Sequence, residues 1–293
     1  MTQKHIKPML AHMYEKHSSK LKFPCYVQPK LDGMRCIYNY DKEQFFSRNG
    51  NIINSMNTLR DELKEAMYAY IIARPNIHPF HIDGELYNHS MTFQQIVSST
   101  RKTVNTENED TRIEYHMFDI IPIYAAERNM SQEQRLHILL DFAFFAEKYF
   151  ENPRLVFVDT LFIRTEDRLY DHYASFIKQK YEGIICRNKE ARYKNKRSFD
   201  LLKLKPVDTS ELHVFNMKEG QGKYSETLGY LECINDLGKE VHVGSGFTDA
   251  QRNEIWNNKD KFYAKKYITI KHNGYTDDNI ERFPIFLAFR DYE

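Results

Sequence analysis

The segment 207–293 carries the pattern that most restricts how this chain can fold. Apolar and polar residues alternate in five short runs separated by turn residues, and the runs are Leu212–Met217, Leu228–Ile234, Glu240–Gly244, Tyr267–Lys271 and Ile285–Arg290. Alternation with a period of two predicts strands that bury one face. A single helix is predicted among them, at Thr248–Asn258. Strands this short and closely spaced favour a small closed barrel of the OB-fold type, an architecture that often binds nucleic acid.

The chain before Lys205-Pro206 has a different character and predicts a lobe that mixes helices with strands. Apolar residues at helical spacing predict helices at 58–73, with Thr58 as the N-cap, at 131–149, with Ser131 as the N-cap, and at 166–180. Alternating patterns predict a strand, a turn at 39–42 and a returning strand within 24–48, and further strands at 155–163 and 184–187. A chain of 293 residues is long enough for two domains, so we expect one domain at 1–206 and another at 207–293.

Composition argues against several classes of protein. No apolar run is long enough to span a bilayer, and the polar start Met1–His5 lacks the hydrophobic region of a secretory signal. The four cysteines are scattered and form no C-x-x-C pair, which argues against a zinc site or a disulfide framework. We therefore expect an intracellular protein without a membrane partner. The net charge of +1 argues against binding of nucleic acid by bulk positive charge but allows a local basic face.

The segment Lys30–Arg35 (KLDGMR) contains residues suited to covalent chemistry. A lysine is a nucleophile only while its amine is unprotonated, and nearby positive charge favours that state. Within the segment, Gly33 permits a close backbone approach, Asp32 can orient the lysine, and Arg35 offers a fork that suits a phosphate.

A second lysine pair completes this set. Lys203 and Lys205 flank Leu204, so they would project from one face of a strand. There they could destabilise the Lys30 ammonium and neutralise a triphosphate. The three lysines together predict a site that handles a nucleotide.

Further short motifs lie along the chain in a particular order. They are Ser47-Arg48-Asn49-Gly50, Asp83-Gly84-Glu85, Phe118-Asp119, Glu182-Gly183-Ile184 and Lys203-Leu204-Lys205. With Lys30–Arg35, this series resembles the covalent nucleotidyltransferases, and most closely the small ATP-dependent DNA ligases of viral and bacterial type. The resemblance extends over nearly the whole chain. Pro8–Ala11 is similar to the opening of these enzymes, and the segments 219–223, 244–248 and 282–284 are similar to signatures of their OB domain.

The resemblance implies both a fold and an activity. The fold would be of the α+β class, with a nucleotidyltransferase (adenylation) domain of antiparallel sheets and helices followed by a C-terminal OB-fold β-barrel. ATP would donate AMP to Lys30, the AMP would pass to the 5′-phosphate at a nick in duplex DNA, and the 3′-hydroxyl would then displace it. Each step is a phosphoryl transfer dominated by positioning and charge neutralisation, so Mg²⁺ or Mn²⁺ would be required. Such an enzyme would act as a monomer in DNA repair, replication or recombination.

The resemblance also assigns roles to individual residues. Lys30 would be the nucleophile, Phe118 would stack on adenine, and Gln28 would hydrogen-bond the adenine edge. Glu85 would hold the ribose hydroxyl or a metal ion, and Glu182 would also bind the metal. Arg48 would bind the nick phosphate, with Asp32 assigned to the same substrate phosphate. The full set expected around the nucleotide is Gln28, Lys30, Leu31, Arg35, Arg48, Glu85, Phe118, Glu182, Lys203 and Lys205.

The sequence departs from the resemblance in its last part. Many relatives carry a basic residue shortly after an arginine and an aspartate, whereas Arg290-Asp291 is followed here by Tyr292-Glu293. The expected contact with pyrophosphate would therefore fall to Arg290. Some viral relatives close a long loop around DNA, and the segment 220–228 is too short for such a loop. An N-terminal DNA-binding domain is not expected either.

Two alternatives remain open on the sequence alone. An RNA ligase or an mRNA-capping guanylyltransferase shares the lysine chemistry, although the segments 244–248 and 282–284 favour a DNA ligase. A nucleic-acid-binding module that had lost catalysis would be expected to lack one of the charged motif residues, and all of them are present. His81, beside the Asp83 motif, is expected to be structural.

Overall fold

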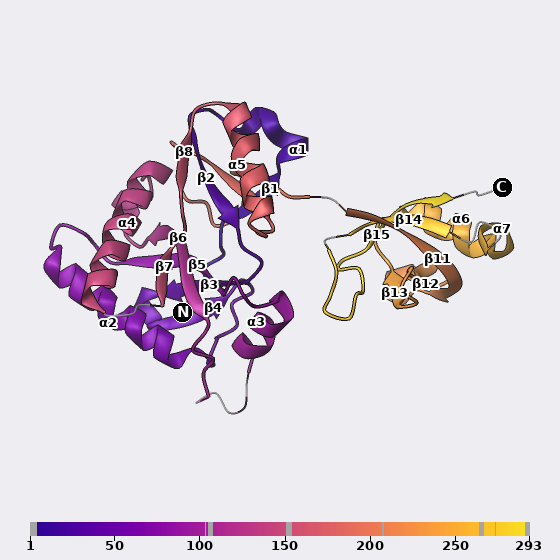
Figure 1. Cartoon of the computed structure of the whole chain (residues 1–293), viewed down its shortest axis with the longest axis horizontal. Helices are drawn as coiled ribbons and strands as arrows, with labels where there is room; N and C mark the ends of the chain where they lie inside the picture. Colours follow the sequence, from indigo (N-terminus) through magenta and orange to yellow (C-terminus); the bar gives the residue numbers. More distant parts are fainter. Residues whose placement is uncertain are drawn as a thin grey trace. The chain divides into compact units, whose positions relative to one another are not determined.

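The computed structural model of this chain describes residues 5–102, 104, 108–150, 154–206, 208–263, 267–272 and 274–290. They form two compact units, residues 1–205 and residues 206–293, which are described separately (Figure 1). Among these residues, no helix is long and apolar enough to cross a membrane.

The first unit contains two five-stranded sheets, and the first of them carries Lys30. Its strand order is β1 (Leu10–Met13), β10 (Arg197–Leu204), β9 (Gly183–Asn188), β2 (Cys25–Lys30) and β8 (Leu161–Ile163). β1 pairs with β10 in parallel, and the other neighbours are antiparallel. The helices α1 (Tyr14–His17) and α5 (Glu166–Lys178) contribute to a core with Val27 and Cys186 of this sheet. Because successive side chains point to opposite faces, Gln28 and Lys30 lie on the face away from this core.

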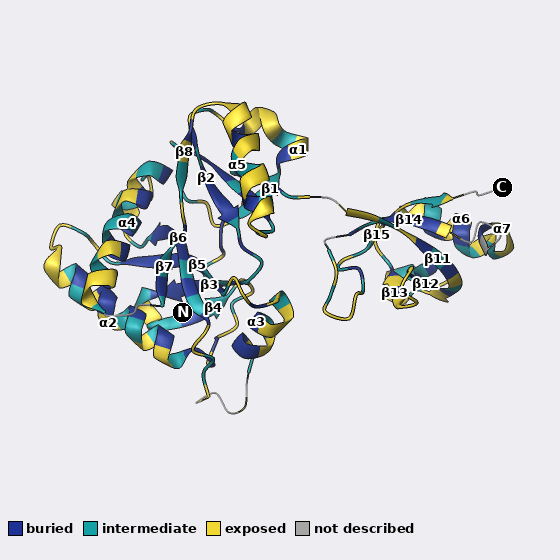
Figure 2. Cartoon of the chain, viewed as in Figure 1, coloured by how far each residue is buried: buried dark blue, intermediate teal, exposed yellow. Residues whose placement is uncertain are grey.

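The second sheet supplies the opposite group of motif residues. Its order is β4 (Gln44–Ser47), β3 (Met34–Asn39), β5 (Phe80–Tyr87), β6 (Glu114–Pro122) and β7 (Leu155–Phe157). The helices of this half are α2 (Asn57–Ala73), α3 (Phe93–Thr100) and α4 (Gln132–Tyr149), and short 3₁₀ turns lie at Ser18–Lys20, Tyr40–Lys42 and Ala125–Glu127. α2 and α4 bury one side against the sheet and expose the other (Figure 2).

Two runs that were each predicted as a single strand divide into two strands, and the two strands lie in different sheets. The strand expected from Pro24 onward breaks after Lys30, so that β2 lies in the first sheet and the hairpin of β3 and β4 in the second. Gly33 lies in this break, where an added Cβ would come within 2.5 Å of the Leu86 carbonyl oxygen. The run predicted at 155–163 divides in the same way, into β7 and β8. A residue pattern reports local periodicity, not the sheet in which a strand pairs.

The predicted helices agree with the structure except at one start. Ser131 and Thr248 are the N-caps of α4 and α6 (Asp249–Asn257), each with a full capping box. Thr58, by contrast, lies inside α2, because the carboxylate of Glu109 accepts hydrogen bonds from the backbone N–H groups of Thr58 and Leu59. A partner this distant in the sequence replaces the local cap, and local pattern cannot reveal it.

The second unit confirms the five predicted strands. They are β11 (Asp208–Glu219), β12 (Leu228–Ile234), β13 (Glu240–Val243), β14 (Tyr267–His272) and β15 (Ile285–Arg290), in the order β13-β12-β11-β14-β15. The helix α7 (Lys259–Tyr263) and a 3₁₀ turn at Gly222–Tyr224 complete this unit.

The sheet of the second unit is not closed by a continuous ladder, in contrast to the expected closed barrel. Between its two ends the described residues form one bridge, Ser245 to Ile285, where the Phe286 N–H donates to the Ser245 carbonyl at 2.8 Å. β13 is only four residues long, and the chain then turns into α6 behind Thr248. Too few residues therefore remain beside β15 for a longer ladder. The α+β class and the OB-like unit stand as predicted.

The assignment of Ser131 as the N-cap of α4 can be tested by mutation. Replacing Ser131 with Ala should lower the free energy of unfolding of the first unit by about 1 kcal/mol, because the Gln134 N–H loses its acceptor. Urea unfolding monitored by circular dichroism measures the change. Ser131→Asp keeps a capping oxygen and serves as the control. Equal loss in both variants would contradict the assignment of the cap.

Candidate active site

Three adjacent strands bring the lysines and Glu182 together. Lys30, the last residue of β2, lies opposite Gly183, the first residue of β9, and Leu204 of β10 lies opposite Ile184. The Glu182 N–H donates to the Lys30 carbonyl oxygen at 3.0 Å. Strand register therefore places Lys30, Glu182 and the lysines on either side of Leu204 at one end of the sheet.

Glu182 is the centre of this cluster. One of its oxygens forms an ion pair with the Lys30 ammonium, and the other accepts from Lys205 Nζ at 3.2 Å. Burial would raise the pKa of the Glu182 carboxyl, but Lys30 and Lys205 outweigh that effect and hold the pKa below its ordinary value. Burial and the charges of Lys30 and Lys205 lower the pKa of Lys203. The site thus concentrates positive charge around a single carboxylate.

The contact between Lys30 and Glu182 adds a feature that sequence reasoning did not give. Cations near Lys30 were expected, and the structure places Lys203 and Lys205 within its electrostatic reach. The group that touches the Lys30 amine, however, is a carboxylate, which occupies the amine that would have to approach a phosphorus. Removal of that contact is therefore a condition for nucleophilic use of Lys30.

The second sheet contributes Glu85 and Arg35 from paired positions of β5 and β3. One oxygen of Glu85 accepts from the Gly33 N–H at 2.8 Å, and burial raises the pKa of Glu85. The Arg35 guanidinium donates to both oxygens of Asp83, at 2.7 and 2.5 Å. The fork that was expected to hold a phosphate is thus occupied by Asp83, which also accepts from the Tyr193 hydroxyl at 2.5 Å.

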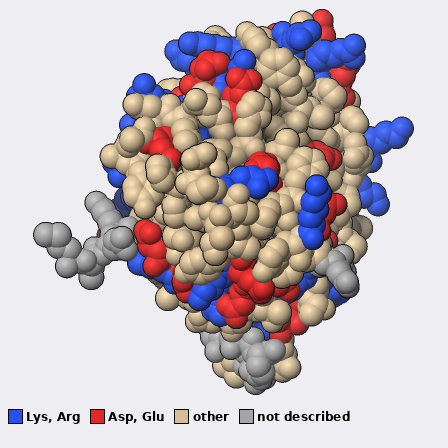
Figure 3. All heavy atoms as spheres, turned by 90° about the vertical axis from the view of Figure 1, so that its left-hand side faces the viewer, with Lys and Arg blue, Asp and Glu red and all other residues tan. Residues whose placement is uncertain are grey.

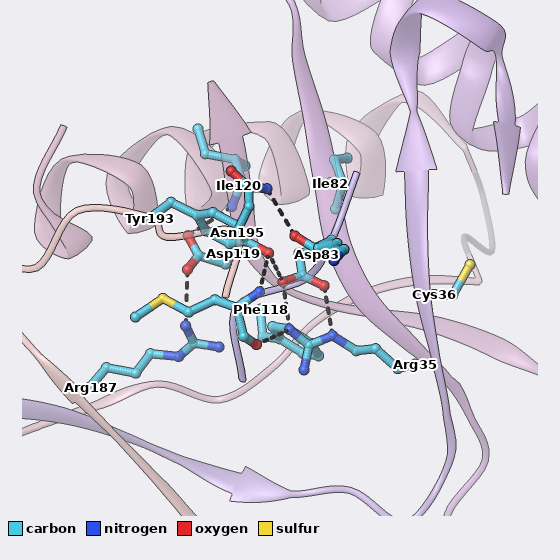
Figure 4. A network of polar contacts seen from close by, with 12 residues as sticks. Arg35, Cys36, Ile82, Asp83, Phe118, Asp119, Ile120, Arg187, Tyr193 and Asn195 are labelled. Carbon is cyan, nitrogen blue, oxygen red and sulfur yellow. Dashed lines mark hydrogen bonds and ion pairs between the residues drawn. The ribbon is translucent and has the colours of Figure 1, made fainter. Parts of the chain in front are cut away.

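Phe118 lies between Arg187 of the first sheet and Arg35 of the second (Figure 4). The guanidinium carbons of Arg35 and Arg187 lie 4.3 and 5.3 Å from the centroid of its ring. The Gln28 amide is committed to protein partners: it donates to the Phe118 carbonyl and to Thr160, and it accepts from Arg187 at 2.7 Å. The amide expected at the adenine edge is therefore already fully bonded.

Sequence reasoning missed a buried network behind Phe118. Asp119 accepts from Arg187 at 2.9 Å and from Arg135 at 2.8 Å, and all three side chains are almost fully buried. Arg187 also bonds Gln28, so the network joins β9 and β2 of the first sheet to β6 of the second. The Phe118-Asp119 motif was the available signal for Asp119. The two arginines gave none, because arginines are rarely buried.

The remaining predicted residues are Leu31, Asp32 and Arg48. Leu31 is buried, and its carbonyl lies 3.4 Å from Lys30 Nζ. Asp32 is half-buried beside it. Arg48 is exposed in the turn after β4, where its carbonyl accepts from His5, and its side chain has no partner among the residues that the structure describes. The structure does not bring the Arg48 side chain into contact with the lysine cluster.

Comparison with known proteins assigns this chain to a family. A model described as the ATP dependent DNA ligase domain matches residues 8–205, and one described as a DNA ligase OB-like domain matches residues 219–290. The chain belongs to the ATP-dependent DNA ligase family. It is therefore a polynucleotide ligase that takes ATP as its AMP donor.

Individual relatives support the assignment. A DNA ligase of Haemophilus influenzae is 26% identical over 265 residues, which cover 89% of this chain and 84% of the relative. A DNA ligase of African swine fever virus is 27% identical over 219 residues, 72% of this chain but only 48% of the relative. A solved structure from a study of DNA binding by Lig E DNA ligases has a TM-score of 0.74 at 22% identity and covers 97% of this chain and 99% of its own. At that identity the last comparison shows a shared fold.

The electrostatic role of Glu182 in this ligase can be tested through stability. Its folded pKa lies below the unfolded value, so its stabilisation is complete above the unfolded pKa, about 4.3, and is lost as the pH falls through the folded pKa. Glu182→Gln should lower the free energy of unfolding by about 1–3 kcal/mol at pH 7, because three lysines lose their shared counter-charge.

The difference between the wild type and Glu182→Gln should shrink below about pH 4. Urea unfolding over a pH series measures it. Glu147→Gln, at an exposed site on α4, is the matched control and should change little at any pH. A difference that stayed constant from neutral to acidic pH would contradict the role of the Glu182 charge.

Proposed function

We propose that this ligase seals nicks in duplex DNA through a covalent bond between Lys30 and AMP. The observation that carries the proposal is the placement of Lys30 at the end of β2, paired with Glu182 and within the field of Lys203 and Lys205. A nucleophilic lysine needs cations both to disfavour its own ammonium and to neutralise the phosphates that it attacks.

The first step joins Lys30 to the nucleotide. The unprotonated amine attacks the α-phosphorus of ATP, an N–P bond forms, the bond from that phosphorus to pyrophosphate breaks, and the amine gives up a proton. Lys205, held at 3.2 Å from Glu182, and the partly buried Lys203 would neutralise the phosphates. The incoming phosphates would compete with Glu182 for Lys205 and so loosen the cluster around Lys30.

The adenosine would occupy the space between the two sheets. Adenine would stack on Phe118 and displace the Arg35 guanidinium, which lies 4.3 Å from that ring. Arg35 would then be free to contact a phosphate. Gln28 would act as a positioning residue, because its amide holds the Phe118 carbonyl and accepts from Arg187.

A divalent ion fits the carboxylates of this site. Glu85 has a second oxygen beyond the one bonded to Gly33, and Glu182 is held in its charged form; oxygen ligands of this kind suit Mg²⁺. When bound, the ion would neutralise negative charge on the phosphates. Glu85 and Glu182 would hold it, and Glu85 could instead accept from the ribose hydroxyl.

The later steps require a nicked duplex. AMP passes to the 5′-phosphate, as the N–P bond breaks and an O–P bond forms, and the 3′-hydroxyl then attacks that phosphate and releases AMP. Arg48, exposed after β4, would bind the 5′-phosphate, and Asp32 would contribute to the same phosphate site. The face drawn in Figure 3 mixes Lys and Arg with Asp and Glu, so DNA binding would depend on local contacts of this kind.

Further aspects of the proposal concern the whole chain. The unit at 1–206 would carry the nucleotide chemistry, and the OB-like unit at 207–293 would contribute to holding DNA. The enzyme would act as a monomer inside the cell, where ATP and DNA are both available. Arg290 would be the candidate for the pyrophosphate contact, and Asp291 to Glu293 lie outside the described residues.

A sealing assay tests the substrate and the nucleotide together. Wild-type protein with ATP and Mg²⁺ should join nicked duplex DNA, and Lys30→Arg, which keeps the positive charge, should abolish joining because an arginine cannot take the role of the amine. Nicked RNA and GTP are the parallel arms. Sealing of RNA but not DNA would favour an RNA ligase, and labelling of the protein by GTP would favour a capping enzyme. If the protein showed neither sealing nor labelling, the nucleic-acid-binding module without catalysis would be favoured.

The role of Arg48 separates the first step from the later ones. Arg48→Ala should leave formation of the AMP adduct within about twofold of wild type but slow sealing at least about tenfold, because a charged contact to the 5′-phosphate is lost. Rapid-quench measurement of each step provides the readout. Arg168→Ala, at an exposed site on α5, is the control. An equal loss in both steps would remove Arg48 from the phosphate site.

A further inference from the structure

A cavity of about 450 Å³ lies on the first unit beyond the residues that contact Lys30. Its floor is built from buried side chains of the second sheet, Ile37 and Asn39 of β3, His81 of β5 and Ile121 of β6. These positions continue the strands that carry Arg35, Asp83 and Asp119, and neither Lys30 nor Phe118 lines the cavity. The cavity is therefore separate from the site proposed for ATP.

His81, a largely buried residue, contributes a hydrogen-bond donor to this cavity. The Tyr40 N–H donates to His81 Nδ1 at 3.1 Å, and burial lowers the pKa of His81 to about 4, so that the neutral ring carries its proton on Nε2. Only 6% of His81 is exposed, and among the described residues its Nε2 has no hydrogen-bond partner. The expectation that His81 is structural therefore accounts for one ring nitrogen and leaves the other for a ligand.

The rest of the lining combines a second donor, apolar surface and positive charge. The side-chain Oδ1 of Asn39 accepts from the Lys42 backbone N–H, which leaves the side-chain NH₂ group of Asn39 as a donor. Phe46 offers an aromatic ring, while Lys42 and Arg128 are exposed cations, and Lys42 Nζ lies 5.3 Å from the centroid of the Phe46 ring. Among the described residues that line the cavity, Asp41 is the one with a carboxylate.

We propose that this cavity binds a mononucleotide, with its base on the floor formed by His81 and Asn39 and its phosphate at Lys42 and Arg128. Every nucleobase offers hydrogen-bond acceptors and a flat apolar face, and cavities of this size suit ligands of this class. The proposal rests on the proposed function, because the reaction releases AMP and acts on terminal nucleotides of DNA strands.

The cavity lies near residues that the proposed function assigns to both possible sources of a nucleotide, free AMP and the end of a DNA strand. Phe46 lies two residues before Arg48, and His5, which also lines the cavity, bonds the Arg48 carbonyl. Tyr193 also lines the cavity and donates to Asp83, which holds Arg35. An occupant would therefore contact neighbours of both the nick-phosphate residue and the nucleotide site.

The test follows the His81 ring in the full-length protein by nitrogen NMR with labelled histidine, and His81→Asn identifies its signal. AMP should shift the His81 signal in a saturable manner, and Arg128→Glu should weaken the apparent affinity at least about tenfold. Arg168→Glu makes the same charge change on α5 and should leave the affinity unchanged. Both arginines are exposed, so neither variant should disturb folding.

A second titration with nicked duplex DNA identifies the source of the nucleotide. A His81 shift with AMP supports a site for the free nucleotide, and a shift with nicked DNA alone supports a site for a strand-terminal nucleotide. Absence of both shifts, or equal weakening by Arg128→Glu and Arg168→Glu, would overturn the proposal. Adduct formation on Lys30 is measured separately, so a failure of the ligase mechanism is distinguishable from a failure of the cavity to bind.

Discussion

The paired contact of Glu182 with Lys30 and Lys205 is the interaction on which the active site depends. One carboxylate, just before β9, holds Lys30 at the end of β2 and Lys205 just after β10, the two strands that flank β9. Without a counter-charge, three lysines around the ends of β2 and β10 would repel one another. Glu182 supplies that counter-charge, and in the proposed mechanism the negative phosphates of ATP would replace it.

A second set of interactions joins the two sheets of the first unit through buried side chains. Arg187, on β9, bonds Gln28 on β2 and Asp119 on β6. Breaking a buried ion pair by removing one partner is costly, so this connection is expected to be rigid. This connection lies directly behind Phe118 and, in the proposed site, would fix where an adenine ring could stack.

Several features could be predicted from the sequence because they depend on local pattern. Strands β11 to β15 alternate apolar and polar residues, and Ser131 and Thr248 begin helices with short capping motifs. The order of short motifs around Lys30 also predicted that Glu182 and Lys205 belong with it, and the structure places them in contact.

The remaining features depend on tertiary structure. The break between β2 and β3 assigns two similar-looking runs to different sheets, and Glu109 caps α2 from far along the chain. Buried arginines such as Arg187 read as surface residues in any hydrophobicity pattern. The bonds that now occupy Gln28 and Arg35 also follow from side-chain placement, which spacing alone does not determine.

The most direct test of the central claim is to locate the nucleotide on the protein. Wild-type protein incubated with ATP and Mg²⁺ would be digested, and the modified peptide sequenced by mass spectrometry. The account predicts AMP on the side chain of Lys30, joined by an acid-labile bond between nitrogen and phosphorus. AMP on any other residue, or nick sealing by a protein that carries no adduct at any stage, would contradict it.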